Sequence, residues 1–333
     1  MANRRWAEMR DLYPARLVEL LRERSIIYVP SGILEWHDEH LPMGTDTLKM
    51  EEICRRTARL TGGLVHMPSY LGVGAITPSY GTLTHGGIGY SNSLAKQYLL
   101  ELCTQLELLG AGLIVLSYGH TSPDNINVHE EAAWEYNQRP LAHARVLAMN
   151  DVAPAVKYRY KVADHAAKWE TSFMLASCPA LVDQARLPVD HGEFWGLDPR
   201  QHASAAKGER MYSLVAEETA KLVELACLAL RESLANQAYT GSQHCWETCQ
   251  NLADLASNYW QGDECWEDPF CWYCEWRSPG LMRVLLKRHG RAWLERRLAL
   301  WREAAKPYSI RCKFAMGQIE AEWRELCQTQ LTK

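Results

Sequence analysis

Short apolar runs alternate with helical segments through the first 240 of this chain's 333 residues. The run 25–30, Ser-Ile-Ile-Tyr-Val-Pro, is rich in β-branched residues and is followed by Ser-Gly, which is typical of a buried strand that ends in a turn. Apolar runs at 64–67 and 112–117 predict two further strands, and 155–160 predicts a weaker one. This alternation restricts the chain to a small set of layered folds.

Helices lie between and after these runs. The segment 91–110 begins with the N-cap candidates Ser91 and Asn92, carries leucines near helical spacing and stops at Gly110, so it predicts a helix. A longer helix is predicted over 211–234. Strands that alternate with helices imply right-handed crossovers, and hence a doubly wound α/β fold with a mostly parallel sheet sandwiched by helices. Ligands in such folds bind outside the carboxyl ends of the strands.

Composition excludes several classes of protein. The chain is 47% hydrophobic and 23% charged, which supports a globular core. Its formal charge of −4 gives no overall basic field for nucleic acid, and no stretch approaches the roughly 18 apolar residues of a membrane span. The N-terminal segment lacks the apolar core of a secretory signal, so we expect a cytoplasmic protein with mostly reduced cysteines.

The composition shifts near Ala238, which predicts a main domain over 1–240 and a Trp/Cys-rich helical C-terminal appendage over 241–333. The appendage carries eight of the 13 tryptophans, a density that suggests a lid, a subunit contact or a partner surface. Its basic segment 281–306 could bind an acidic partner, although a solvated helix face is the favoured interpretation. A structural zinc is one alternative to ordinary thiols for the cysteines Cys245, Cys249, Cys271 and Cys274.

The densest polar signal is the segment 32–46, which follows the first predicted strand. Glu35 and His37 are two residues apart and can point to one side of an extended segment, and Asp46 returns a second carboxylate. Carboxylate and imidazole are ligands that zinc, manganese and iron accept. The alternative is a solvated acidic loop in which Asp46 caps a helix that starts near Thr47.

This segment resembles the first motif of the creatininase (creatinine amidohydrolase) family, G-S-x-E-Q-H-G-x-H-L-P-L-x-T-D. The matching residues are Gly32, Glu35, His37, His40, Leu41, Pro42, Thr45 and Asp46. A second family motif, N-G-H-G-G-N, is met only by Gly119 and His120. A third, H-A-G-x-x-E-T-S, is met over 165–172 with one glycine replaced by alanine.

The resemblance implies a binuclear site of two divalent ions, zinc, manganese or iron, with Asp46 as the bridge between them. The implied metal ligands are Glu35, His37, Asp46, His120 and Glu170. Glu170 is included because Ser122 stands where creatininase itself has a glutamate. His165 matches the family's catalytic histidine, and His40 is expected to orient a ligand or to fix the Leu-Pro loop.

The implied reaction is hydrolysis of a C–N amide bond by a metal-bridging hydroxide, with His165 protonating the leaving nitrogen. The substrate would be a small cyclic amide or a peptide-like molecule. Family relatives form rings, often hexamers, so a homo-oligomer is expected. The candidate substrate contacts are Asp38 and Glu39, which replace the family's usual Gly-Pro, together with His85, Tyr118 and Thr121.

A second hypothesis is a non-catalytic member of the family that serves as a scaffold or binding subunit. The presence of all the candidate ligands together with His165 argues against it, because a binding module has no need of the complete set. We expect neither nucleic acid nor a membrane as a partner.

Overall fold

The computed structural model of the protein describes residues 5–74, 86–139, 142–151, 164–187 and 196–237, with scattered helical positions between 291 and 328. The chain divides into two compact units. The first unit comprises Met1–Trp36, Met43–Tyr160 and Glu209–Gly262, and the second comprises His37–Pro42, Lys161–Gly208 and Asp263–Lys333.

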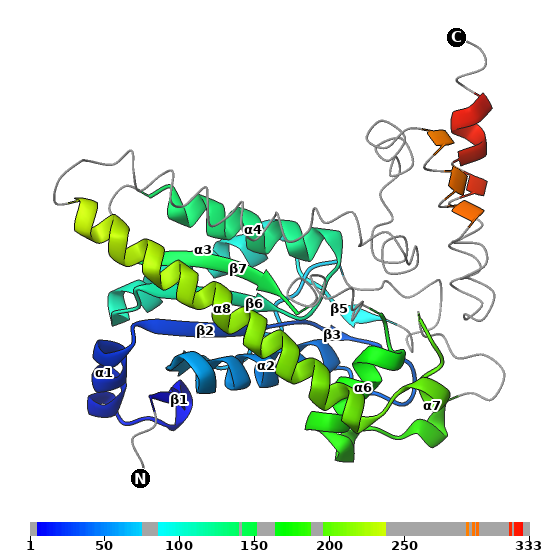
Figure 1. The fold of residues 1–333 in the computed structure, drawn as a ribbon, viewed down its shortest axis with the longest axis horizontal. Helices are drawn as coiled ribbons and strands as arrows, with labels where there is room; N and C mark the ends of the chain where they lie inside the picture. The colour runs from blue at the N-terminus through cyan, green and yellow to red at the C-terminus, as the bar shows by residue number, and fades with distance from the viewer. Residues whose placement is uncertain are drawn as a thin grey trace. The chain divides into compact units, whose positions relative to one another are not determined.

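The first unit contains a parallel sheet whose strand order is β1-β4-β2-β6-β7 (Figure 1). Its strands are β1 Trp6–Glu8, β2 Ile26–Ser31, β4 Gly63–Val65, β6 Leu113–Tyr118 and β7 Arg145–Asn150. The chain passes from β2 to its neighbour β4 and then crosses to β6 on the opposite side of β2. The carboxyl ends of β2 and β6 therefore lie beside a topological switch point, where ligands of doubly wound folds bind.

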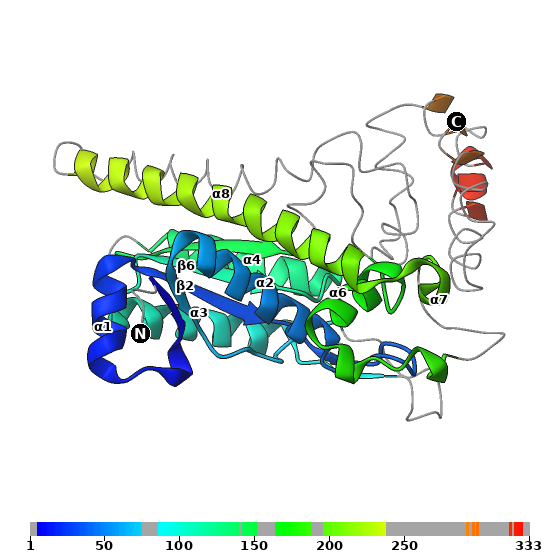
Figure 2. The same ribbon diagram turned by 60° about the horizontal axis from the view of Figure 1, so that its bottom comes forward.

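Helices cover both faces of this sheet (Figure 2). The Tyr28 hydroxyl lies 2.5 Å from Thr61 Oγ1, so alternate side chains of β2 face α2. Ile27 and Val29 point the other way and join a buried core with side chains from α1, α3 and α4. The long α8 runs along the same face as α2, as Figure 2 shows. The helices of this unit are α1 Pro14–Glu23, α2 Thr45–Thr61, α3 Asn92–Leu109, α4 Pro123–Asn137 and most of α8 Ala205–Gln237.

The predicted elements appear close to their expected bounds. Strands β2, β4 and β6 and helices α3 and α8 correspond to the runs at 25–30, 64–67, 112–117, 91–110 and 211–234. Ser91 caps α3 by accepting a hydrogen bond from the Leu94 amide, and Gly110 ends it in the left-handed conformation with φ 111°. The prediction of a doubly wound α/β fold is confirmed.

Several elements were not predicted, among them α1, α4, β1 and β7. The predicted strand at 155–160 lies outside the described residues, as do His85, the four cysteines of the suggested zinc site and nearly all of the segment 241–333. No helix among the described residues is long and apolar enough to cross a membrane.

The remaining elements are short. A two-stranded antiparallel sheet pairs β3 Leu34–Glu35 with β5 Gly87–Ile88, and η1 Met9–Asp11 follows β1. The second unit contains α6 Lys168–Ser177, η2 Pro179–Leu181, η3 Gln184–Arg186 and α7 Pro199–His202.

Candidate metal centre

The segment that follows β2 is buried rather than solvated. Glu35 is 2% exposed and pairs with Gly87 in the short sheet of β3 and β5, and its amide donates to the Met43 carbonyl at 2.9 Å. Asp46 is also 2% exposed and lies in the first turn of α2, whose N-cap is Gly44. The alternative of a solvated loop capped by Asp46 is therefore wrong.

A close backbone approach brings the loop after β6 onto the start of α2. A Cβ atom at Gly119 would lie 2.2 Å from the carbonyl oxygen of Asp46, a separation that real side chains do not reach. The Gly119 amide also donates to the Ser31 carbonyl at the end of β2. Glycine at this position lets His120, the next residue, stand directly beside Asp46.

We call Glu35, Asp46 and His120 the first cluster. His120 Nδ1 lies 3.4 Å from Glu35 Oε2 and 3.1 Å from Asp46 Oδ2, and one ligand atom from each residue lies within 4.8 Å of the others. Two adjacent buried carboxylates are costly in a low-dielectric site without positive charge nearby. This donor set, two carboxylates and an imidazole, fits a divalent ion such as zinc or manganese.

Two charged residues that sequence reasoning missed lie against this cluster. The Lys49 ammonium is 3.4 Å from Asp46 Oδ1 and 3.0 Å from Asp151 Oδ2, and both Lys49 and Asp151 are buried. Lys49 lies three residues after Asp46 in α2, so the two share a helix face. Asp151 follows β7 directly. The signal available in the sequence was the i, i+3 spacing of Asp46 and Lys49.

A buried hydrogen-bond network supports His120 from behind. Asn125 Nδ2 donates to the His120 carbonyl at 2.7 Å, and His129 Nδ1 lies 2.8 Å from the Asn125 carbonyl. His129 Nε2 lies 2.9 Å from the Ser31 hydroxyl. Burial lowers the pKa of His129 to about 4, so the ring is neutral and can donate at Nδ1 while accepting at Nε2.

The candidate substrate contacts of this region differ in exposure. The Tyr118 ring is 1% exposed and lies 4.5 Å from the His129 ring, and burial raises the pKa of its hydroxyl. Thr121 is partly buried, at the start of the loop that leads into α4. Tyr118 is thus part of the packing behind His120, whereas Thr121 has some exposed surface.

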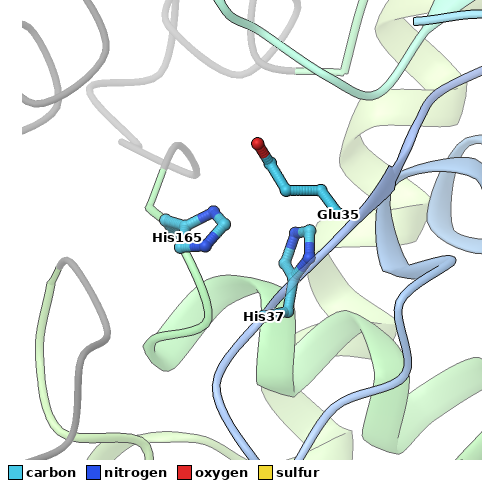
Figure 3. Close-up of side chains that lie close together, drawn as sticks. All are labelled: Glu35, His37 and His165. Carbon is cyan, nitrogen blue, oxygen red and sulfur yellow. The ribbon is translucent and has the colours of Figure 1, made fainter. Parts of the chain in front are cut away.

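The second unit holds His37, His165 and Glu170, which we call the second cluster. His37 Nε2 lies 3.3 Å from Glu170 Oε2, and all three residues are at most 7% exposed. The rings of His37 and His165 are 4.4 Å apart between centroids and face each other in Figure 3, where Glu35 is the residue two positions before His37. A carboxylate beside two imidazoles is again a donor set that divalent ions accept.

Backbone amides at the start of α6 orient this cluster. The Ala166 amide donates to Glu170 Oε2 at 2.7 Å. The Asp164 carboxylate accepts from the amides of Trp169 and Glu170, at 2.6 and 3.1 Å, and so satisfies two donors of the first turn. These contacts fix the direction in which α6 presents Glu170.

His40, Asp38 and Glu39 differ sharply in their surroundings. His40 Nε2 lies 2.8 Å from the Thr171 hydroxyl, and burial followed by repulsion from His37 lowers the pKa of the ring to about 4. Asp38 stands where the family motif has glycine, and it adopts a φ of 57° in the left-handed region. It is buried, with Oδ1 accepting from the Glu39 amide, whereas Glu39 is exposed.

The parallel sheet and the buried carboxylate–imidazole clusters describe an α/β protein with groups of side chains that could hold a metal ion. The family model Creatininase, described as creatinine amidohydrolase, matches residues 11–223. The chain therefore belongs to the creatininase family.

Solved structures give the same fold. A crystal structure of creatinine amidohydrolase (creatininase) matches with a TM-score of 0.53 and 22% identity over 65% of this chain and 96% of that one. A structure named manganese creatininase gives the same values. A protein provisionally named creatinine amidohydrolase from Bacteroides fragilis matches with a TM-score of 0.51 and 20% identity over 66% of this chain and 95% of that one. No curated protein sequence matches the chain.

Proposed function

We propose that this chain is a metal-dependent hydrolase of C–N amide bonds that acts on a small cyclic amide or a peptide-like substrate. The observation that carries the proposal is the pair of buried carboxylate–imidazole clusters, one in each unit. Only Trp36 separates Glu35 of the first cluster from His37 of the second, so the chain itself ties the clusters together.

In this proposal, Glu35, Asp46 and His120 hold one divalent ion, and His37 and Glu170 hold a second. Asp46 is the carboxylate shared between them. Among the matched creatininase structures, one is named for manganese and another is a Zn–Zn type. Carboxylate-rich mixed sites accept zinc, manganese and iron, so cellular availability would select the metal.

The bound ions would supply an activated water and a Lewis acid for the amide carbonyl. A side chain of the protein would then have to donate a proton to the amide nitrogen, which is a poor leaving group until it is protonated. His165 is suited to that task because its imidazole lies beside His37, with ring centroids 4.4 Å apart. One matched creatininase structure is a complex with creatine, which supports a small guanidino or amide substrate class for this chain too.

Metal analysis tests the ligand assignment. Protein stripped with a chelator and reloaded should hold about two ions per chain. Asp46→Ala should lose bound metal while remaining folded, whereas Glu131→Ala, which removes an exposed carboxylate on α4, should bind as the wild type does. A wild-type protein that binds no divalent ion would overturn the proposal.

Turnover tests the role of His165. His165→Ala should keep the metals and lose about 10²- to 10⁴-fold in rate, the usual contribution of a general acid. His143→Ala, at an exposed position, is the matched control. The rate is measured on a panel of cyclic amides, lactams and short peptides. A metal-loaded wild type that hydrolyses none of them would favour a scaffold, and an active His165→Ala variant would remove that residue from the mechanism.

A further inference from the structure

Asp46 has its two carboxylate oxygens assigned to different neighbours. Oδ1 lies 3.4 Å from the Lys49 ammonium, and Oδ2 lies 3.1 Å from His120 Nδ1. One edge of the Asp46 carboxylate thus faces the Lys49 ammonium, and the other faces His120. Lys49 therefore has the position needed to fix which oxygen of Asp46 faces the first cluster.

The ammonium itself is held by a second acid. Lys49 Nζ lies 3.0 Å from Asp151 Oδ2, which is closer than its distance to Asp46. The side chains of Lys49 and Asp151 are 5% and 1% exposed, so water does little to screen this pair. A buried ammonium needs such a partner, since an unpaired one is strongly unfavourable.

The charges of these residues also balance a divalent ion. Glu35, Asp46 and Asp151 carry three negative charges when ionised, and Lys49 carries one positive charge. The remainder is two negative charges, an excess that a divalent cation at the first cluster would offset. Asp151 draws the Lys49 ammonium away from Asp46, where it would otherwise compete with a metal for the carboxylate.

We infer that Lys49 and Asp151 are positioning residues that make Asp46 a ligand through Oδ2 alone. Asp151 holds the ammonium, the ammonium holds Oδ1, and Oδ2 is left facing His120 and Glu35. This inference rests on the proposed metal centre and adds two residues to it.

The test is metal affinity, measured by competition with a chromogenic chelator for zinc or manganese. Asp151→Asn keeps the shape of the side chain but releases the ammonium to Asp46, so affinity should fall by about 10- to 100-fold, as for other residues that orient metal ligands. The double variant K49M/D151N removes the competitor as well and should recover most of the loss. Glu131→Gln, in the exposed pair with Lys96, is the matched control and should bind as the wild type does.

The outcomes separate the two proposals. A wild type without metal affinity overturns both the metal centre and this inference. The inference alone is overturned if the wild type binds metal and folded Asp151→Asn binds it with the same affinity. In that case the substitution would lower only the melting temperature of the metal-free protein. Should Asp151→Asn not fold, a crystal structure of the metal-loaded wild type decides. We expect one Asp46 oxygen to bind the metal while the other stays beside the Lys49 ammonium. A structure in which both Asp46 oxygens bind metal would overturn the inference.

Discussion

The two carboxylate–imidazole clusters are positioned by different kinds of contact. The first cluster depends on the backbone of the parallel sheet, because Gly119 touches the Asp46 carbonyl and hydrogen-bonds to the end of β2. The second cluster depends on side chains that satisfy amides, with Asp164 and Glu170 accepting hydrogen bonds at the start of α6. We therefore expect a change at the Gly119 backbone to disturb the fold around the first cluster, and the loss of an amide acceptor to disturb the second.

The largest expected effect comes from Gly119→Ala, which attacks the backbone contact of the first cluster. The new methyl group would meet a carbonyl oxygen that α2 holds in place, so the free energy of unfolding should fall by about 1–3 kcal/mol. Metal affinity should fall as well, because His120 moves away from Asp46. Urea unfolding and chelator competition measure the two effects.

Gly44→Ala, at the N-cap of α2, is the matched control. Its Cβ would lie 3.3 Å from the Tyr70 ring, a side chain that can shift, and the residue already has an ordinary φ of −91°. Its effect on unfolding should be less than half that of Gly119→Ala. Equal effects would mean that the close approach of Gly119 does not set the geometry of the first cluster.

We expect an effect of intermediate size when the pH is lowered, because His129, which supports His120, is then protonated on unfolding. The unfolded chain protonates a histidine below about pH 6.5, whereas buried His129 resists protonation until about pH 4. The unfolded chain thus binds more protons in this window, and stability falls as the pH is lowered from 6.5 toward 4, by about 1.4 kcal/mol per pH unit for this residue. The slope is measured by urea unfolding across that pH range.

His129→Leu should be less stable than the wild type at pH 7, because it leaves the Asn125 carbonyl and the Ser31 hydroxyl without their partner. It should also show a shallower loss of stability below pH 6.5, since one proton uptake is gone. His143→Leu, at an exposed position, serves as the control and should retain the wild-type slope. An unchanged slope in His129→Leu would show that its protonation does not contribute to acid unfolding.

The sequence predicted the parts of the fold that carry strong local signals. Strands β2 and β6 are continuous apolar runs, and α3 has both a serine N-cap and a glycine stop. Helix α4 was not predicted, because the residues after His120 were compared only with a family motif. In the structure Ser122 caps the helix and Pro123 occupies its first turn, a start signal that the sequence did contain.

Some residues of the candidate site could likewise be predicted from the sequence, and others could not. Motif spacing and the rule for strand ends were enough to select Glu35, Asp46 and His120, which the structure brings together. Lys49 and Asp151 could not be selected, because a single lysine on a helix is ordinarily solvated and its buried partner follows β7, a strand that was not predicted. Whether all five proposed ligands share one centre stays a prediction.

The smallest expected effect comes from Asp164→Asn, which attacks the polar contacts of the second cluster. Asparagine offers one acceptor oxygen in place of two, so either the Trp169 or the Glu170 amide loses its acceptor, and unfolding should become easier by about 0.5–2 kcal/mol, the usual range for a helix cap. Asp183→Asn is the matched control, because its carboxylate accepts from the Ala185 amide at the exposed start of η3.

The informative measurement for Asp164→Asn is a metal titration rather than stability alone. If the clusters are positioned separately, the variant should weaken one of two binding steps and leave the other at its wild-type affinity. Loss of both steps together would mean that the ion held by Glu35, Asp46 and His120 needs the orientation of Glu170. In that case the contrast between backbone and side-chain positioning would fail, because the two clusters would act as one centre linked through Asp46.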